Sequence, residues 1–491
     1  MRKMFNKIAL AVLGISIISC NNWLDVDSDT NVKSEVLFDD YQGFHTAVNG
    51  VYRLLGAAQL YGRDLTWGVA SIIGNNYNEA KLPTEYASLV NYAYDENNNS
   101  NLIDPIWEQG YSVIANCNNI IANVVKRDSS FFPEKQVEKD VILGEMLGVR
   151  AMMHFDLLRL FAPAPATKPN GKYIPYVTVY PSHMTEHLTV EATLDSIIRD
   201  LELAKNLLAY NDTLYNRDYM YNRRIRLEYG GTFFSFRGLR MNFFAATAIL
   251  GRVYLWRNAE GDKQKALRCA NDMYRFSTEQ NWFAFTDYWD LETEINSIHR
   301  KMPEDILFAG YNDDLYNLYA LTKNMGTFFA FKNYNGEKDL FGNEVDDFRY
   351  RKLIETDGTS RRWAKPEDES TANAAEVIKY QGPLAPVIRM SEVYYTMCEC
   401  LAETDLAQAK SILGTVRLAR GVNQPLADEL GKDEFLEILY IEMTREFMSE
   451  GQTFFLYKRL NRPIYNGAKP LDMTGRYVLP IPHSEDAYSK L

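Results

Sequence analysis

The stretch GEMLGVRAMMHFDLLRLFAPAP, residues 144–165, decides how the chain folds. This stretch and the residues just before it carry apolar side chains three or four positions apart. They are Ile142, Met146, Val149, Met153, Leu157 and Leu160. Such spacing places all of them on one face of an α-helix, which we expect from about Glu134 to Phe161. Pro163 and Pro165 cannot continue a helix and therefore mark its end.

Similar patterns predict further helices before and after this one. They cover Asp104–Lys126, stretches that begin near Thr189, Arg240 and Asp262, and residues 387–403 and 406–420. Asp104 has the character of an N-cap, with Pro105 as the first helical residue. The last two helices are separated by a turn at Thr404–Asp405, and Gly421 ends the second one.

Several of these helices form helix-turn-helix pairs with small residues at the expected contacts. The small residues are Ala246, Ala266, Ala270, Ala407 and Ala409. The pairs are similar to tetratricopeptide (TPR) repeats, although their period is irregular. We therefore predict a mainly α fold in which TPR-like pairs form a scaffold, with long irregular loops and a few short strands.

The first residues, MRKMFNKIALAVLGISIISC, have the pattern of a bacterial lipoprotein leader. A basic head precedes an apolar run, Ile8–Ile18, which is too short for the roughly 20 residues that span a bilayer. We expect residues 1–19 to be a signal peptide, Cys20 to be lipidated, and residues 20–35 to form a flexible acidic tether. Ordinary secretion, with Cys20 unmodified or removed, is the alternative.

Charge and cysteine content exclude several classes of protein. The net charge is −12, and it becomes −15 without the three basic residues of the leader, which argues against nucleic-acid binding. Cys398 and Cys400 lie two positions apart in a predicted helix, so they cannot share a metal ion. His183 and His187 have helical spacing but follow Pro181 in a predicted loop. We therefore predict no metal site and no cofactor.

One pair of carboxylates could suggest catalysis. Glu446 and Glu450 are four residues apart on a predicted helix, and paired carboxylates carry glycoside hydrolysis. Arg445 and Arg459 are nearby cations, and a carboxylate paired with arginine has a pKa too low for a general acid. We predict structural ion pairs here and no enzymatic activity, with a glycosidase as the alternative.

Two further pairs are predicted to orient helices through ion pairing. They are Glu145 with Arg150 and Arg389 with Glu392.

Ligand contacts are expected where aromatic and amide side chains share a loop, because a sugar offers one apolar face and a fringe of hydroxyl groups. Two segments and one single residue meet this description. The candidates are Trp67, Asn76, Tyr77, Tyr311, Asn312, Tyr316 and Trp289. Packing inside the protein is the alternative for each of them. If Trp67 and Tyr77 line the site, replacing both with alanine should weaken glycan binding without unfolding the protein.

The chain also resembles the SusD/RagB lipoproteins, over seven segments in the order of that family. They are WLDVDSDTNV after Cys20, YQGFHTAVNGVYRLL, the quoted stretch with Glu145, Arg150 and Ala151, ATAILGRVYLW, the pair IRMSEVYYTMCECLAE and MTREFMSEGQTFFLYKRL, and the closing LPIPHSE. The resemblance covers essentially the whole chain after Cys20. It implies a SusD-like helical domain over residues 36–491, with an N-terminal part to about 260 and a C-terminal part from about 261.

The resemblance further implies a surface-exposed lipoprotein of the outer membrane, anchored by acyl chains. Its partners would be an oligosaccharide and a SusC-like TonB-dependent β-barrel transporter, and it would not be an enzyme. Two alternatives remain open at this point. The chain could capture peptides instead of glycans, or it could be a lipid-anchored TPR-like scaffold without a small ligand.

Overall fold

The computed structural model describes most of the chain after residue 33. The described residues are 34–94, 99–217, 220, 232–234, 236–286, 300–324, 329–330, 340–357, 360–365, 382–467 and 469–485. Cys20 and the rest of the predicted leader and tether up to residue 33 lie outside them, as does Trp289. Within the described ranges, no helix combines the length and the apolar character that a membrane span requires.

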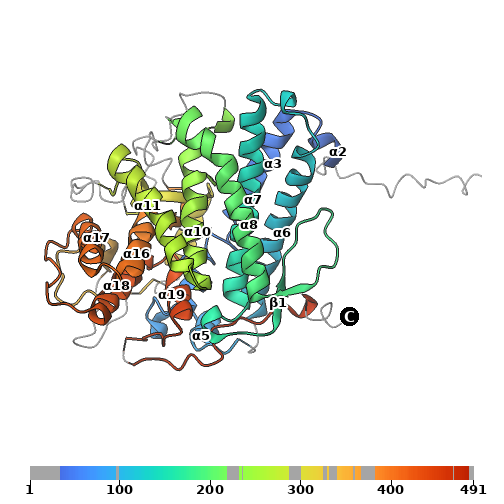
Figure 1. The fold of residues 1–491 in the computed structure, drawn as a ribbon. Coiled ribbons are helices and arrows are strands. Elements are labelled where there is room, and N and C mark those ends of the chain that lie inside the picture. The colour runs from blue at the N-terminus through green and yellow to red at the C-terminus, as the bar shows by residue number, and fades with distance from the viewer. Residues whose placement is uncertain are drawn as a thin grey trace, which may run out of the picture.

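The protein is mainly helical, as predicted (Figure 1). The helices of the first half are α2 (Ser34–Leu37), α3 (Tyr41–Leu55), α4 (Val69–Ile73), α5 (Ala87–Val90), α6 (Ser100–Val124), α7 (Lys135–Phe161) and α8 (Val190–Tyr210). Those of the second half are α10 (Phe243–Arg257), α11 (Asp262–Gln280), α13 (Leu315–Asn324), α14 (Phe348–Leu353), α16 (Met390–Leu401), α17 (Leu406–Ala419), α18 (Lys432–Phe447) and α19 (Gln452–Leu460).

The described strands form three short antiparallel pairs. These are β1 (Lys172–Pro175) with β2 (His187–Thr189), β3 (Ile306–Tyr311) with β6 (Leu384–Arg389), and β4 (Ile354–Asp357) with β5 (Ser360–Trp363). A π-helical turn, Asn211–Tyr215, extends α8. Single 3₁₀ turns occur at Glu79–Lys81, Thr84–Tyr86, Ser129–Phe131, Pro165–Thr167, Thr232–Phe234, Arg237–Leu239 and Pro303–Asp305.

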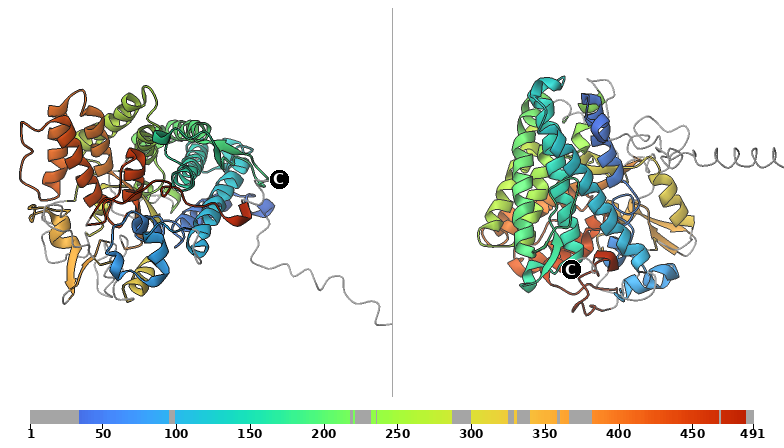
Figure 2. Two further views of the ribbon diagram at one scale, coloured as in Figure 1. Left: turned by 90° about the horizontal axis from the view of Figure 1, so that it is seen from below. Right: turned by 90° about the vertical axis from the view of Figure 1, so that its right-hand side faces the viewer.

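The long helices pack against their neighbours in chain order. Helix α6 contacts α7, α7 contacts α8, and the series continues through α10, α11 and α16 to α17. In the right-hand view of Figure 2 these helices form a layer on one side, and the strand pairs between residues 306 and 389 lie on the other. The arrangement confirms the predicted scaffold of paired helices.

Helix α7 carries the stretch that decided the prediction, and it ends at Phe161 as expected. It is buried on more than one face, because α6, α8 and α10 all pack on it. Two glycines permit the close approach. A Cβ atom on Gly144 would lie 2.7 Å from Leu208 Cγ, and one on Gly148 would lie 2.7 Å from Met241 Cγ.

Helix α6 begins at Ser100, four residues before the predicted start, so the assignment of Asp104 as its N-cap was wrong. The extra turn is held by a hydrogen bond of 2.8 Å from the amide of Ile103 to the carbonyl of Asn99. Ile103 is fully buried, so the turn also gains apolar contact. Pro105 therefore lies inside the helix, where only the carbonyl of Asn101 lacks its usual partner.

The last predicted pair has the expected turn but a later start. Residues 387–389 belong to β6 and pair with β3, so α16 begins at Met390. Asp405 caps α17 by accepting a hydrogen bond from the amide of Gln408, and Gly421 has the predicted positive φ of 83°. Of the alanines expected at helix contacts, four are buried and Ala407 is exposed.

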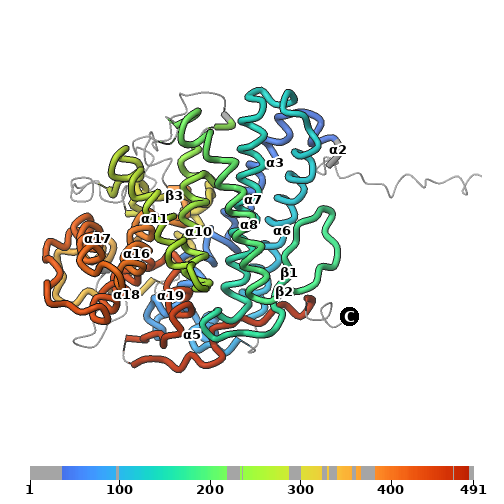
Figure 3. The backbone as a smooth tube through the Cα atoms, in the orientation of Figure 1, coloured from blue at the N-terminus to red at the C-terminus, as the bar shows by residue number. Residues whose placement is uncertain are grey.

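The C-terminal segment returns to the first half of the molecule (Figure 3). The amide of Leu479 donates a hydrogen bond of 3.0 Å to the carbonyl of Leu160 at the end of α7. His187 Nε2 lies 3.0 Å from Glu485 Oε1, which joins β2 to the same segment. The two halves of the chain therefore share one hydrophobic core.

Candidate functional site

The two segments chosen as ligand contacts lie close together in the structure. The ring of Trp67, just before α4, is 6.2 Å from that of Tyr319 in α13 and 5.5 Å from that of Phe329. Phe329 also lies 5.6 Å from Tyr77. We call Trp67, Tyr77, Tyr319 and Phe329 the aromatic cluster. The predicted contacts do not include Tyr319, although it ends the second segment, or Phe329, which lies outside both segments.

The aromatic cluster is internal. Trp67 is 3% exposed and Tyr77 is 1% exposed. The hydroxyl of Tyr77 donates to the carbonyl of Trp67 at 2.9 Å and lies 3.1 Å from Ser449 Oγ. A sugar ring cannot stack on either side chain in this conformation, and their removal would leave a cavity. The expectation that both could be truncated without harm to the fold is therefore not supported.

Asn76 is equally buried and has a structural partner. Its side-chain amide donates to Thr453 Oγ1 at 3.0 Å, which joins the end of α4 to α19. In this conformation its amide is directed to the protein and not to solvent.

Of the three contacts predicted in the second segment, one is exposed to solvent. Asn312 is half-buried, and its amide donates to the carbonyl of Gly56 at 2.7 Å. Tyr311 is half-buried at the end of β3. Tyr316, in the first turn of α13, is 41% exposed. Of the seven predicted contacts, Tyr316 is therefore the one in the described part of the chain that solvent reaches freely.

Exposed polar residues neighbour Tyr316 along the chain. Asp313 and Asn317 are exposed beside it, and the amide of Asn317 donates to Asp314 Oδ1 at 2.6 Å. We call Asp313, Tyr316 and Asn317 the α13 edge. An accessible ring next to amide and carboxylate groups matches the two kinds of surface that a sugar presents.

A small cavity lies between the aromatic cluster and the charged interior. Its volume is about 20 Å³, which admits roughly one water molecule and excludes a sugar ring. Trp67 and Leu315 line one side, and Lys365, Ser449 and Glu450 line the other.

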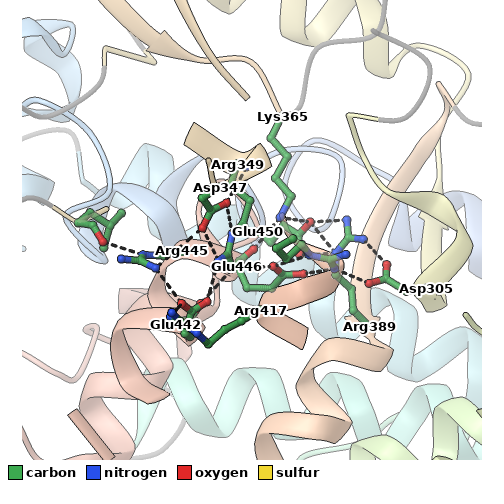
Figure 4. Close-up of polar contacts among 12 residues, drawn as sticks. Asp305, Asp347, Arg349, Lys365, Arg389, Arg417, Glu442, Arg445, Glu446 and Glu450 are labelled. Atoms are coloured by element: carbon green, nitrogen blue, oxygen red, sulfur yellow. Dashed lines mark hydrogen bonds and ion pairs between the residues drawn. The ribbon is translucent and has the colours of Figure 1, made fainter. Parts of the chain in front are cut away.

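The charged interior forms a second cluster, which we call the ion-pair centre (Figure 4). It consists of six acidic and six basic residues that pair with one another. They are Asp305, Glu344, Asp347, Glu442, Glu446 and Glu450 with Arg349, Lys365, Arg389, Arg417, Arg420 and Arg445. Formal charges within the centre therefore cancel.

The two glutamates considered for catalysis are held inside this centre. Glu446 Oε1 lies 2.6 Å from Arg420 Nη2, and Glu446 Oε2 lies 3.1 Å from Arg349 Nη1. Glu450 accepts from Arg389 Nε at 2.8 Å and lies 2.9 Å from Lys365 Nζ. Ion pairing was the predicted role, but the predicted partners Arg445 and Arg459 were wrong.

The electrostatics of Glu446 do not suit a general acid. Burial opposes its charge, yet Arg420 and the other nearby cations outweigh burial and hold the pKa of Glu446 well below its usual value. The carboxylate is also fully buried and its oxygens are already occupied. The arrangement therefore joins α14, α17 and α18 and leaves no proton for catalysis at this residue.

Both ion pairs predicted within single segments were wrong in their partners. Glu145 accepts from Arg237 and Arg240, whereas Arg150 Nη2 lies 2.6 Å from Asp200 Oδ2 on α8. Residues five apart on a helix point to different sides, so Glu145 and Arg150 reach different neighbours.

Arg389 likewise pairs with Glu450 and Asp305 instead of Glu392. Glu392 instead pairs with Arg252 of α10 at 2.5 Å. Arg389 ends β6, whereas Glu392 lies in the first turn of α16, so their side chains leave the chain in different directions.

No group of three or more potential metal ligands occurs among the residues that the structure describes. His187 is in strand β2 and not in a helix, so it does not share a helical face with His183. Cys398 and Cys400 are both buried as free thiols.

Two protein-family models match the chain. The first, described as starch-binding and associating with the outer membrane, matches residues 22–221. The second, described as the SusD family, matches residues 332–477. Together the two matches cover most of the chain.

Individual relatives are distant but share the fold. A SusD superfamily protein from Bacteroides thetaiotaomicron has a TM-score of 0.66 and 21% identity, over 92% of this chain and 98% of its own. A SusD-like carbohydrate binding protein from Bacteroides vulgatus has a TM-score of 0.65 and 16% identity, over 92% and 97%. SusD-like protein P25 from Formosa agariphila is 24% identical over 212 residues, which are 42% of this chain and 38% of that relative.

Proposed function

The chain belongs to the SusD/RagB family, and from this premise we propose that it captures oligosaccharides at the cell surface for uptake. The captured glycan passes to a SusC-like TonB-dependent β-barrel transporter in the outer membrane. The protein itself breaks no bond in the glycan.

The α13 edge is the observation that carries the glycan assignment. Tyr316 offers an accessible ring, and Asp313 and Asn317 offer hydrogen-bond acceptors and donors beside it. Rings of this kind bind the apolar face of a sugar, while the polar groups replace water at its hydroxyls.

The absence of catalysis is proposed from the state of the best carboxylate pair. Glu446 and Glu450 are held by arginine and lysine side chains in the interior of the protein. A glycosidase needs one carboxyl group that is protonated near neutral pH and in contact with the glycan. Glu446 meets neither requirement.

Attachment to the membrane is proposed through Cys20. An apolar run that stops at a single cysteine is the leader pattern of a lipoprotein, and two or more acyl chains anchor a protein stably. Mass spectrometry of the purified protein should find the amino terminus at Cys20 with acyl groups attached. A Cys20→Ser variant should lose them and leave the membrane fraction.

Calorimetry tests the glycan assignment directly. A panel of oligosaccharides and a library of short peptides are titrated into the intact protein. We expect an oligosaccharide to bind, and we expect Tyr316→Ala to weaken that binding about tenfold, the loss of roughly 1.4 kcal/mol. Tyr210→Ala is the matched control, because Tyr210 is 56% exposed at the end of α8. Binding of peptides alone would favour the peptide-capture alternative.

Isolation from outer membranes tests the transporter. A tagged, acylated protein solubilised in mild detergent should bring down a large β-barrel protein in a fixed ratio. The same preparation from Cys20→Ser cells controls for contacts that depend only on membrane attachment.

A further inference from the structure

One end of the helical layer collects side chains from three separate parts of the chain. Arg127, after α6, donates a hydrogen bond to the carbonyl of Phe38, which lies next to α2. Lys139 of α7 in turn donates to the carbonyl of Arg127. The hydroxyl of Tyr215, beyond α8, donates to Glu134 Oε2 at 2.8 Å. Helix α2, the α6–α7 turn and the end of α8 therefore meet at the upper end of the layer in Figure 1.

This end exposes several large apolar side chains. They are Val36, Val125, Tyr210, Leu214 and Tyr215, between 48% and 64% exposed. The rings of Tyr210 and Tyr215 stack on each other with centroids 5.9 Å apart. We call these five residues the apolar end. Scattered apolar residues on a surface need no explanation, but several that gather at one end indicate a contact surface.

Charges on the apolar end are balanced, although the whole chain is strongly acidic. The same segments of chain carry exposed or half-exposed residues of both charges. The acidic ones are Asp39, Asp128 and Glu134, and the basic ones are Lys126, Arg127 and Lys135. An anionic lipid surface would therefore not repel this end as it would repel the chain's average surface.

The position of Cys20 in the chain indicates that lipid is what contacts this surface. Ser34, the first residue of α2, is only 14 positions after Cys20. A chain of that length reaches at most about 50 Å. The lipid anchor is therefore attached to the molecule at the apolar end, which keeps this end at high local concentration near the bilayer.

We propose that the apolar end rests on the outer-leaflet lipid surface, with Tyr210 and Tyr215 at the level of the headgroups. Tyrosine suits this depth because its ring is apolar and its hydroxyl is polar. The inference rests on the lipid-anchor part of the proposed function. It adds an orientation, in which the helical layer stands on the membrane by the end that carries α2.

Depth measurement with a fluorescent label tests this orientation. The acylated protein, carrying Leu214→Cys or Leu418→Cys, is labelled with an environment-sensitive dye and bound to vesicles of phosphatidylethanolamine and phosphatidylglycerol. Leu214 is 64% exposed in the apolar end, and Leu418 is 61% exposed on α17, so the pair is matched. The four other described cysteines are buried and should not react. Quenchers attached to the lipid tails report contact with the bilayer.

We expect the lipid quenchers to reduce emission at position 214 about twofold and to leave position 418 unchanged. A second variant, Val125→Cys in place of Leu214→Cys, should behave like position 214. Equal and weak quenching at 214 and 418 would overturn the proposal.

If the dye at position 214 becomes shielded from water only as the protein concentration rises, a second copy of the chain covers this surface. Shielding that appears only when a β-barrel protein is added would indicate the transporter. Either result would overturn contact with lipid.

Flotation of the same samples separates this inference from the proposed function. Protein that floats with the vesicles is anchored, whatever its orientation. Floating protein without quenching at position 214 would refute the orientation and leave the anchor intact. Protein that does not float, with no acyl groups by mass spectrometry, would refute the anchor itself.

Discussion

The aromatic cluster and the ion-pair centre both contribute side chains to the lining of one small cavity, and they are held together in different ways. Trp67 and Tyr77 pack against other rings and make few polar contacts, whereas each charge in the ion-pair centre faces an opposite charge. The first depends on shape and apolar area, and the second depends on complete pairing. Neither exposes a surface to ligand, so we propose that the ligand face lies outside both, at the α13 edge.

The largest loss of stability should follow substitutions in the aromatic cluster. Truncation of a buried tryptophan removes contacts that no neighbour can replace, and Trp67→Ala alone should lower the unfolding free energy by roughly 3–5 kcal/mol. The double variant with Tyr77→Ala should be worse still, and measurable as loss of soluble protein or a lower denaturant midpoint. A double variant with wild-type stability would show that the cluster opens to solvent, as a ligand platform would.

The ion-pair centre should respond almost as strongly to the loss of one partner. Arg420→Ala leaves Asp305 and Glu446 partly unpaired in the interior, which costs about 3–5 kcal/mol. Arg462→Ala is the control, because Arg462 and its partner Glu437 are 38% and 60% exposed. That pair should contribute less than about 1 kcal/mol. Equal losses in urea denaturation would contradict the distinction between buried and exposed pairs.

Low pH should weaken the ion-pair centre more than the aromatic cluster. Burial opposes the charge of Glu446, but Arg420 outweighs it, so the folded-state pKa of Glu446 lies well below its usual value. The carboxylate therefore contributes stability that is complete above about pH 5 and is lost as the pH falls towards the folded-state pKa. The unfolding free energy should therefore fall as the pH drops below about 5, more steeply in the wild type than in Glu446→Gln.

Glu437→Gln is the control for the acid measurement. Glu437 is 60% exposed, so this variant should keep the slope of the wild type. A Glu446→Gln variant with an unchanged slope would show that Glu446 is not held as a charged group.

The smallest effect on stability is expected at the α13 edge. Tyr316 is 41% exposed in the first turn of a helix, so Tyr316→Ala should change the unfolding free energy by less than about 0.5 kcal/mol. A thermal melt beside the wild type is sufficient to measure this. A loss of several kcal/mol would mean that Tyr316 packs inside the protein and is not free for ligand.

The helical scaffold could be predicted because its signals are local. Helix α7 follows from a spacing of three and four residues, and Asp405 caps α17 because a side chain three residues away can receive the bond. The start of α6 could not be predicted in the same way. It depends on the burial of Ile103, which only the packed structure supplies.

The candidate site could be predicted less well, because burial and pairing depend on residues far along the chain. Tyr77 meets Ser449, and Glu446 meets Arg349, across gaps that no periodic pattern reveals. Composition drew attention to aromatic and amide residues, yet it could not tell an internal ring such as Trp67 from an accessible one such as Tyr316. Glutamates four apart, as at Glu442 and Glu446, were a signal for the ion-pair centre.

One titration tests the central claim, that the protein binds a glycan at the α13 edge without changing it. The intact protein is titrated in a calorimeter with the oligosaccharide that binds it most tightly. The oligosaccharide is then recovered, and its mass is measured by mass spectrometry. We predict saturable binding that Tyr316→Ala weakens about tenfold, and a recovered ligand of unchanged mass. Binding that is indifferent to Tyr316, or recovery of shorter fragments, would contradict the account.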